Sequence, residues 1–227
     1  ELKGHIFALL DYFKKFENSD GLLEDLDGWI FLEWSRANDK DVVCGVNYPT
    51  NMTYAACLEA AGHLYDEPSL CVKGHTIKEQ VRRQSFNGSF FVDNAIRIDG
   101  VLTPTETTTE VCQYYAFFFD VATPSLYPEL FQTLLTDFGP QRKETKAYPD
   151  VPFANAFIGN YLRLDILYRY QCYEQMLQEF KGYFYRMAVK TGTLWENDTE
   201  RASCNHGFAS HVAYWLLQLR EHSDLVL

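Results

Sequence analysis

The feature that most constrains this chain is the recurrence of apolar residues at three- and four-residue intervals, in segments separated by polar or Pro-containing turns. This spacing places the apolar side chains on one face of a helix. Because helix follows loop throughout, we expect a mainly α protein and not a parallel α/β sheet. The predicted helices span residues 5–16, 50–64, 69–86, 109–121, 125–138, 154–168, 173–190 and 207–222.

Two stretches depart from the helical pattern. Residues 21–50 mix aromatic and acidic residues without a clean period, and we predict a long loop with short extended pieces there. Long irregular segments in compact domains are often functional. Residues 89–103 favour a short β-excursion, because apolar residues suited to strands surround the turn signal formed by Asp99 and Gly100.

The order of helices predicts successive antiparallel pairs within a single domain that spans residues 1–227. About four helical hairpins are expected. A closed α/α toroid of six hairpins would therefore lack about its first third, so we predict an incomplete toroid.

Composition excludes several functional classes. The formal net charge is -11 and there is no basic run, which argues against a nucleic-acid partner. No uninterrupted apolar stretch is long enough to form a membrane helix. The six cysteines show neither CxxC spacing nor zinc-finger pairing with histidine, so we expect no metal and no cofactor, and most cysteines are predicted to be buried thiols.

Aromatic residues make up 16% of the chain. Large rings can pack helices tightly against one another, or they can stack on the apolar faces of sugars. Composition leaves both interpretations open.

Three segments together resemble the second half of an α-L-rhamnosidase catalytic domain. They are LEDLDGWIFLEWS at 23–35, FVDNAIRIDG and TTTEVCQYYAF within 91–117, and GTLWE and ASCNHGFASHVAYWL within 192–216. The resemblance implies an (α/α)6 barrel that hydrolyses terminal α-L-rhamnose with inversion, and hence a carbohydrate substrate.

The last of these segments carries the most specific motif, a Trp-Glu pair followed by an Asn-His pair. Inversion needs one carboxyl group as general acid and one carboxylate that activates water. The resemblance implies that Glu196 is the general base, with Trp195 as a sugar-facing ring. Asn205 belongs to the same motif, and His206 could bind sugar hydroxyls or orient the base. The alternative is that Trp195 caps the core and Glu196 lies on a solvated loop.

The loop before the first hairpin is the second expected part of the site. By the same resemblance Trp34 is a stacking ring, and Glu33 or Asp27 accepts hydrogen bonds from sugar hydroxyls. Family members commonly carry Asp where this chain has Glu33. Trp29 could line the same subsite or belong to the core.

Glu110 is a further candidate for substrate binding. Helical spacing places Glu110, Gln113 and Tyr114 on one face, which could border the mouth of a barrel. Equally, the threonine run before Glu110 could cap a helix whose dipole favours an acidic residue there.

The general acid of the resembled family has no counterpart in this chain. Its Arg-Glu-Arg-like motif, followed by Gly-Trp and Gly-Asp, would precede the first helix, so we expect the acid on an upstream half of the parent catalytic domain. The isolated chain should then be weakly active or inactive. Alternatives are another six-hairpin glycosidase, acting for example on glucosides or unsaturated uronides, and a non-catalytic carbohydrate-binding module. The rhamnosidase interpretation requires Trp34, Glu196 and His206 to converge on one site.

Overall fold

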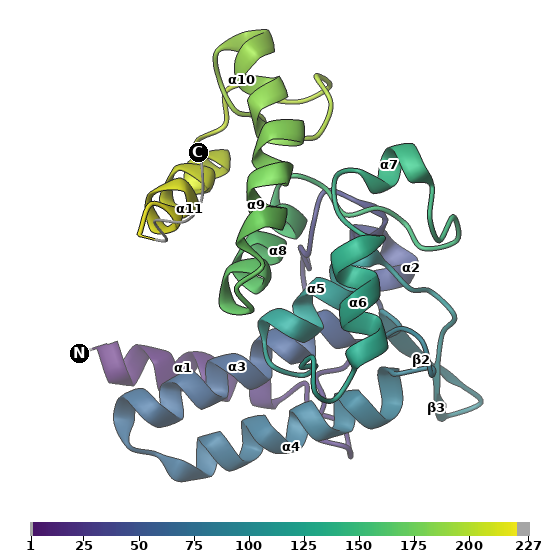
Figure 1. Ribbon diagram of the computed structural model, residues 1–227. Coiled ribbons are helices and arrows are strands. Elements are labelled where there is room, and N and C mark those ends of the chain that lie inside the picture. Colours follow the sequence, from purple (N-terminus) through teal and green to yellow (C-terminus); the bar gives the residue numbers. More distant parts are fainter. Residues whose placement is uncertain (1, 222–227) are drawn as a thin grey trace.

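The computed structural model describes residues 2–221, which form a mainly helical chain with one small sheet (Figure 1). Each of the eight predicted helical segments contains a helix, so the predicted class is confirmed. The predicted end of the last helix, residue 222, lies outside the described residues. The longer helices are α1 (Leu2–Lys14), α3 (Tyr48–Tyr65), α4 (Pro68–Ser85), α5 (Glu110–Phe118), α6 (Pro128–Thr136), α8 (Ile158–Arg169), α9 (Tyr173–Glu179), α10 (Tyr185–Thr191) and α11 (His211–Leu219).

The helices pack in a regular order. Helix α1 contacts α3, α3 contacts α5, and α5 contacts α8. Along the chain, α4 follows α3, α6 follows α5, and α9 follows α8. In the described residues, α3 with α4 and α8 with α9 form contacting helical pairs, and α6 follows α5 along the chain, where about four hairpins were predicted. The helices follow one another along an open curve in Figure 1 and do not close a ring.

Several short elements were not predicted. Helices α2 (Lys40–Val43) and α7 (Arg142–Thr145) are single turns inside expected loops. The predicted helix 173–190 is interrupted by a π-helical stretch, Phe180–Phe184, between α9 and α10. Such stretches are single turns within a regular helix and are too short for apolar spacing to distinguish them.

The sheet has the order β1 (Val46–Asn47), β2 (Asn94–Ile98), β3 (Val101–Pro104), and both pairings are antiparallel. Positive φ angles at Asp99 and Gly100, 50° and 81°, make the tight turn between β2 and β3 that the sequence predicted. Strand β1 lies in the expected loop. It approaches β2 closely because Gly45 has no side chain: a Cβ atom there would lie 2.2 Å from the carbonyl oxygen of Ala95.

Two hydrophobic clusters share helix α8. One face of α8 supplies Leu162 and Ile166 to a cluster with α3, α4, α5 and the sheet. Leu164 and Leu167 belong to a second cluster with α9, α10, α11 and Trp195. Helix α5 is central to the first cluster, and its residues 110–117 are all buried.

Most cysteines are not buried, contrary to the prediction. Only Cys112 is buried, because it alone lies on α5, while the other five are exposed or partly exposed and all six are free thiols. Among residues 2–221, no helix combines the length and the apolar character that crossing a bilayer requires.

Candidate functional site

Glu110 lies at the start of α5, where Thr109 caps the helix by accepting the N–H of Cys112 at 3.2 Å. The Glu110 carboxylate is buried. It pairs with the Arg142 guanidinium and accepts hydrogen bonds from the hydroxyl of Tyr114 and, at 2.8 Å, the N–H of Gly139. Removing one partner of such a buried pair would leave an uncompensated charge. Glu110 therefore fits the capped helix start, and its oxygens are engaged with protein groups.

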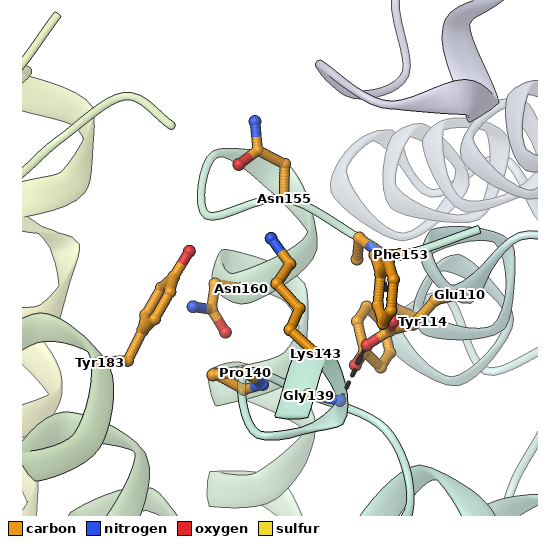
Figure 2. A pocket seen from close by; sticks show the side chains of 10 residues that line it. Glu110, Tyr114, Gly139, Pro140, Lys143, Phe153, Asn155, Asn160 and Tyr183 are labelled. Atoms are coloured by element: carbon orange, nitrogen blue, oxygen red, sulfur yellow. Dashed lines mark hydrogen bonds between the residues drawn. The ribbon is translucent and has the colours of Figure 1, made fainter. Parts of the chain in front are cut away.

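A small polar cavity of about 20 Å³ lies beside Glu110 (Figure 2). Its other side is formed by Lys143, Asn155, Asn160 and Tyr183, and the last of these comes from the π-helical stretch. Lys143 forms an ion pair with Asp198, and burial lowers the pKa of its ammonium group. A polar cavity of this size has room for about one water molecule.

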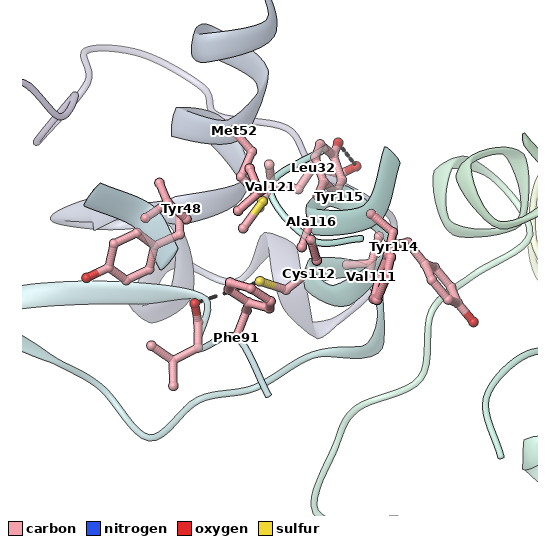
Figure 3. Packing of buried hydrophobic residues seen from close by; sticks show 14 of the residues in the cluster. Leu32, Tyr48, Met52, Phe91, Val111, Cys112, Tyr114, Tyr115, Ala116 and Val121 are labelled. Atoms are coloured by element: carbon pink, nitrogen blue, oxygen red, sulfur yellow. Dashed lines mark hydrogen bonds between the residues drawn. The ribbon is translucent and has the colours of Figure 1, made fainter. Parts of the chain in front are cut away.

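Glu33 is fully buried and caps helix α8 from a distant part of the chain. Its carboxylate accepts the N–H groups of Asn155 at 3.0 Å, Ile158 at 2.9 Å and Gly159 at 2.8 Å. The residue before it is also fixed, because the hydroxyl of Tyr115 donates to the carbonyl of Leu32 at 3.1 Å (Figure 3). The sequence predicted that Glu33 could accept hydrogen bonds from sugar hydroxyls. The structure corrects this, because the carboxylate is buried and accepts backbone N–H groups at the N-terminus of α8.

The pKa of Glu33 is raised to about 7. Burial is the largest cause, and the charge of Glu110 adds to it, while the three backbone N–H groups lower the pKa. Gly159 is needed for this contact, since a Cβ atom there would lie 2.6 Å from the Glu33 Oε2 atom.

Trp34 is the accessible end of a run of aromatic rings. It is 43% exposed, and its ring centroid lies 4.7 Å from that of Phe31. Phe31 is 6.0 Å from Phe157, and Phe157 is 5.4 Å from His206. Two intervening rings thus connect Trp34 with His206, two of the residues that the sequence predicted to converge on one site.

Asp27 and Trp29 lie at the side of this run that faces α1. Both line an apolar hollow of about 410 Å³ between α1, α3 and the residues that precede Trp34. Asp27 is exposed and lies 3.9 Å from the ammonium group of Lys15. Trp29 is 73% exposed, and its ring centroid is 6.0 Å from that of Trp34. Trp29 is thus a surface ring beside Trp34, and the alternative of a core position is wrong.

Trp195 is a core residue. It is 1% exposed, belongs to the second hydrophobic cluster, and donates from Nε1 to the hydroxyl of Thr191 at 2.7 Å. The predicted sugar-facing role is corrected, because the ring is enclosed by the helices of that cluster. The alternative interpretation of Trp195 as a cap on the core agrees with this position.

Glu196 follows Trp195 on a partly exposed loop. Its N–H donates to the carbonyl of Ser203 at 2.9 Å, and its carboxylate accepts the N–H of Ser203 at 3.4 Å. The N–H of His206 donates to the carbonyl of Leu194 at 2.9 Å, so the two ends of the loop are paired. Asn205, next to His206, is exposed.

Residues 155–157 bring the separate parts of the site together. The Asn155 amide donates to the carbonyl of Trp34 at 3.1 Å and accepts the N–H of Asp198, two residues beyond Glu196, at 3.1 Å. Phe157 contacts the ring of His206. Sequence reasoning missed these residues because it placed them inside the regular helix 154–168, where a single Asn gives no distinct signal.

The arrangement is an acidic and aromatic site without a metal centre in the described part of the chain: no group of three or more His, Cys, Asp or Glu side chains there could hold a metal ion. Its accessible chemistry consists of a carboxylate, an imidazole and tryptophan rings. These groups suit proton transfer and the binding of a polyhydroxylated ligand.

Comparison with known proteins gives a likeness of fold. No protein-family model and no curated protein matches the chain. The fold is similar to the crystal structure of a GH78 family rhamnosidase of Bacillus sp. GL1, with a TM-score of 0.75 and 16% sequence identity over 96% of this chain. It is also similar to a rhamnosidase from Klebsiella oxytoca with rhamnose bound, with a TM-score of 0.68 and 15% identity over 98% of the chain.

The chain spans 23% and 42% of the lengths of these two proteins. The expected resemblance in fold to rhamnosidases is therefore confirmed, for a part of their length.

Proposed function

We propose that this chain is part of an inverting glycoside hydrolase of α-L-rhamnosidase type and that Glu196 is its general base. The observation that carries the proposal is the gathering of Trp34, His206 and the Glu196 loop around residues 155–157. The fold similarity to two rhamnosidases supports the same substrate class. A terminal α-L-rhamnose is the proposed substrate.

In this proposal the Glu196 carboxylate takes a proton from a water molecule, and the resulting hydroxide attacks the anomeric carbon. The carboxylate is suited to this step because it is partly exposed and the hydrogen bond described for it, from the N–H of Ser203, is long at 3.4 Å. The leaving oxygen is protonated by an acid that we place on another segment of the parent protein, outside these residues. Trp34 stacks on the sugar, and His206 with Asn205 binds its hydroxyls.

The remaining candidates have supporting positions. Glu33 and Glu110 hold the backbone beneath the site, and Trp195 fixes the start of the Glu196 loop. Asp27 and Trp29 border the neighbouring apolar hollow, where they can contact the part of the substrate beyond the rhamnose.

The test is hydrolysis of an aryl α-L-rhamnoside by the parent protein and by its Glu196→Gln variant. Loss of a general base should lower kcat by roughly 10²–10⁴-fold while rhamnose binding persists. Near-normal turnover by the variant would refute the assignment of Glu196. The isolated chain should bind rhamnose but turn over little, and rapid turnover by it would show that the acid lies within these residues.

A carbohydrate-binding role without catalysis is the second candidate. It is favoured by the positions of Glu33 and Glu110, which are buried and bonded to protein groups, so neither offers an accessible acid opposite Glu196. Rhamnose binding without turnover in the parent protein would support this alternative. A panel of glycosides would distinguish rhamnose from glucose or unsaturated uronide specificity.

A further inference from the structure

We propose that Asn155 is a positioning residue that holds the backbone at Trp34 and the loop that carries Glu196 at a fixed separation. This inference rests on the proposed function. Asn155 touches neither the sugar nor the attacking water in this scheme. It acts by setting the distance between the stacking ring and the general base.

Asn155 makes long-range contacts through both ends of its side-chain amide and through its backbone. Its Nδ2 group donates to the carbonyl of Trp34, 121 residues away in sequence, and its Oδ1 atom accepts the N–H of Asp198, 43 residues away. Oδ1 also accepts the N–H of Ala156 at 2.7 Å. The backbone N–H of Asn155 donates to Glu33 at 3.0 Å. The side chain is thus fixed in the buried segment that directly precedes α8.

The two segments that Asn155 joins have little regular structure of their own. Trp34 and Asp198 both lie in irregular backbone, which has no helix or sheet ladder to hold it. The other polar contacts described for Asp198 come from Lys143 and Arg186, which are on α7 and α10. Within residues 2–221, the hydrogen bonds that connect the Glu196 loop with Trp34 therefore pass through the amide of Asn155.

An amide offers a donor and an acceptor at once, which neither aspartate nor alanine can do. Asn155 is 7% exposed, so a lost bond is not replaced freely by bulk water. Aspartate would keep the acceptor for Asp198 but would direct a carboxylate oxygen at the carbonyl of Trp34.

The consequence for catalysis follows from geometry. A displacement of about 1 Å between reacting groups can lower the rate by about 100-fold. Loss of the hydrogen bonds that the Asn155 side chain makes with Trp34 and Asp198 should therefore lower kcat strongly. The KM should change less, because Trp34 and His206 still contact the sugar.

The experiment compares Asn155→Asp and Asn155→Ala with the control Asn160→Ala. Asn160 is a matched control because it lies on α8, is 5% exposed, and its side chain makes no described hydrogen bond. For each variant of the parent protein, kcat, KM and the melting temperature are measured with an aryl rhamnoside. We expect both Asn155 variants to lose kcat by about 10- to 100-fold, and Asn160→Ala to keep it even if its melting temperature falls as far.

A second readout does not depend on activity. In the isolated chain, the amide hydrogen of Asp198 should exchange faster in Asn155→Ala than in wild type or Asn160→Ala, while Asn155→Asp should keep its protection. An unchanged exchange rate in Asn155→Ala would show that the Asn155 side chain does not hold the N–H of Asp198, and this would overturn the proposal. A loss of kcat that follows the melting temperature equally in all three variants would overturn the positioning role. The expected exchange effects without any rhamnoside turnover by the wild-type parent protein would instead refute the proposed function.

Discussion

The carboxylate of Glu33 lies in the interior and is held by backbone N–H groups, without a described cationic partner. A buried carboxylate of this kind is costly to ionise, which is the physical meaning of its raised pKa. Its position at the N-terminus of α8 offsets part of this cost through the helix dipole.

The raised pKa gives a prediction about stability and pH. Because the folded-state pKa is about 7 and the ordinary value is 4.5, ionisation of Glu33 favours the unfolded chain. Its stabilising contribution is present below pH 4.5 and is lost as the pH rises through 7. Denaturant titrations from pH 4 to pH 8 should show a decline in the free energy of unfolding that is smaller in Glu33→Gln.

The comparison with Glu33→Gln is needed because the pKa of Asp93 is also raised to about 7, by burial, and contributes in the same pH window. That contribution is common to both proteins and cancels in their difference. Equal pH dependence in wild type and variant would show that Glu33 does not ionise in this range.

The two tryptophans of the predicted site should respond oppositely to substitution. Trp195→Ala removes a buried ring and should lower the free energy of unfolding by about 3–5 kcal/mol. Trp34→Ala removes a half-exposed ring and should alter stability little, but it should weaken rhamnose binding. Chemical denaturation and a fluorescence titration with rhamnose measure the two effects. A Trp34 variant that binds rhamnose normally would contradict the stacking role.

The sequence identified the residue types of the site better than their exposure. Trp34, His206 and the loop that carries Glu196 lie around residues 155–157, and their roles in a site stay a prediction. Exposure could not be predicted in the same way. An acidic residue beside a tryptophan in an irregular loop suits a solvated site as well as the cap of a helix far along the chain, and the contact between Glu33 and Gly159 is visible only in three dimensions.

At the scale of elements, the pairing of β1 with β2 depends on a close approach between the backbone at Gly45 and the backbone of β2. Gly45 has a φ angle of 65°, and a Cβ atom there would collide with the carbonyl of Ala95 in β2. Gly45→Ala should therefore detach β1 from β2 and lower the melting temperature. Gly21→Ala is the matched control, because Gly21 also has a positive φ, 76°, but has open space around its Cβ position. Equal melting temperatures for the two variants would show that strain alone, and not the collision, limits this position.

Helices were predicted from sequence more completely than the elements between them. A helix of three or more turns repeats its apolar spacing several times, as α3 and α4 do, whereas β1 has only two residues and α7 only four. The β2–β3 turn was predictable because its two residues carry a strong local signal.

At the scale of the whole molecule, the order of helices along the chain was enough to predict the class. The contacts of α5 with α3 and with α8 could not be predicted from the sequence, because they join residues far apart in the chain. The same holds for the candidate site, which combines the loop before α3, the start of α8 and the loop before α11. Sequence motifs marked the first and the last of these, and the middle one, which joins them, was found only in the structure.

Helix α8 belongs to both hydrophobic clusters, with Leu162 and Ile166 in one and Leu164 and Leu167 in the other. Two opposite sides of the same cylinder are therefore committed to packing, and its first turn is committed to Glu33. Few of its positions remain where evolutionary drift is free to act. Over the history of such a chain, α8 would accept substitutions more slowly than an exposed helix such as α1, which has no buried residue, even though only its first residues adjoin the site.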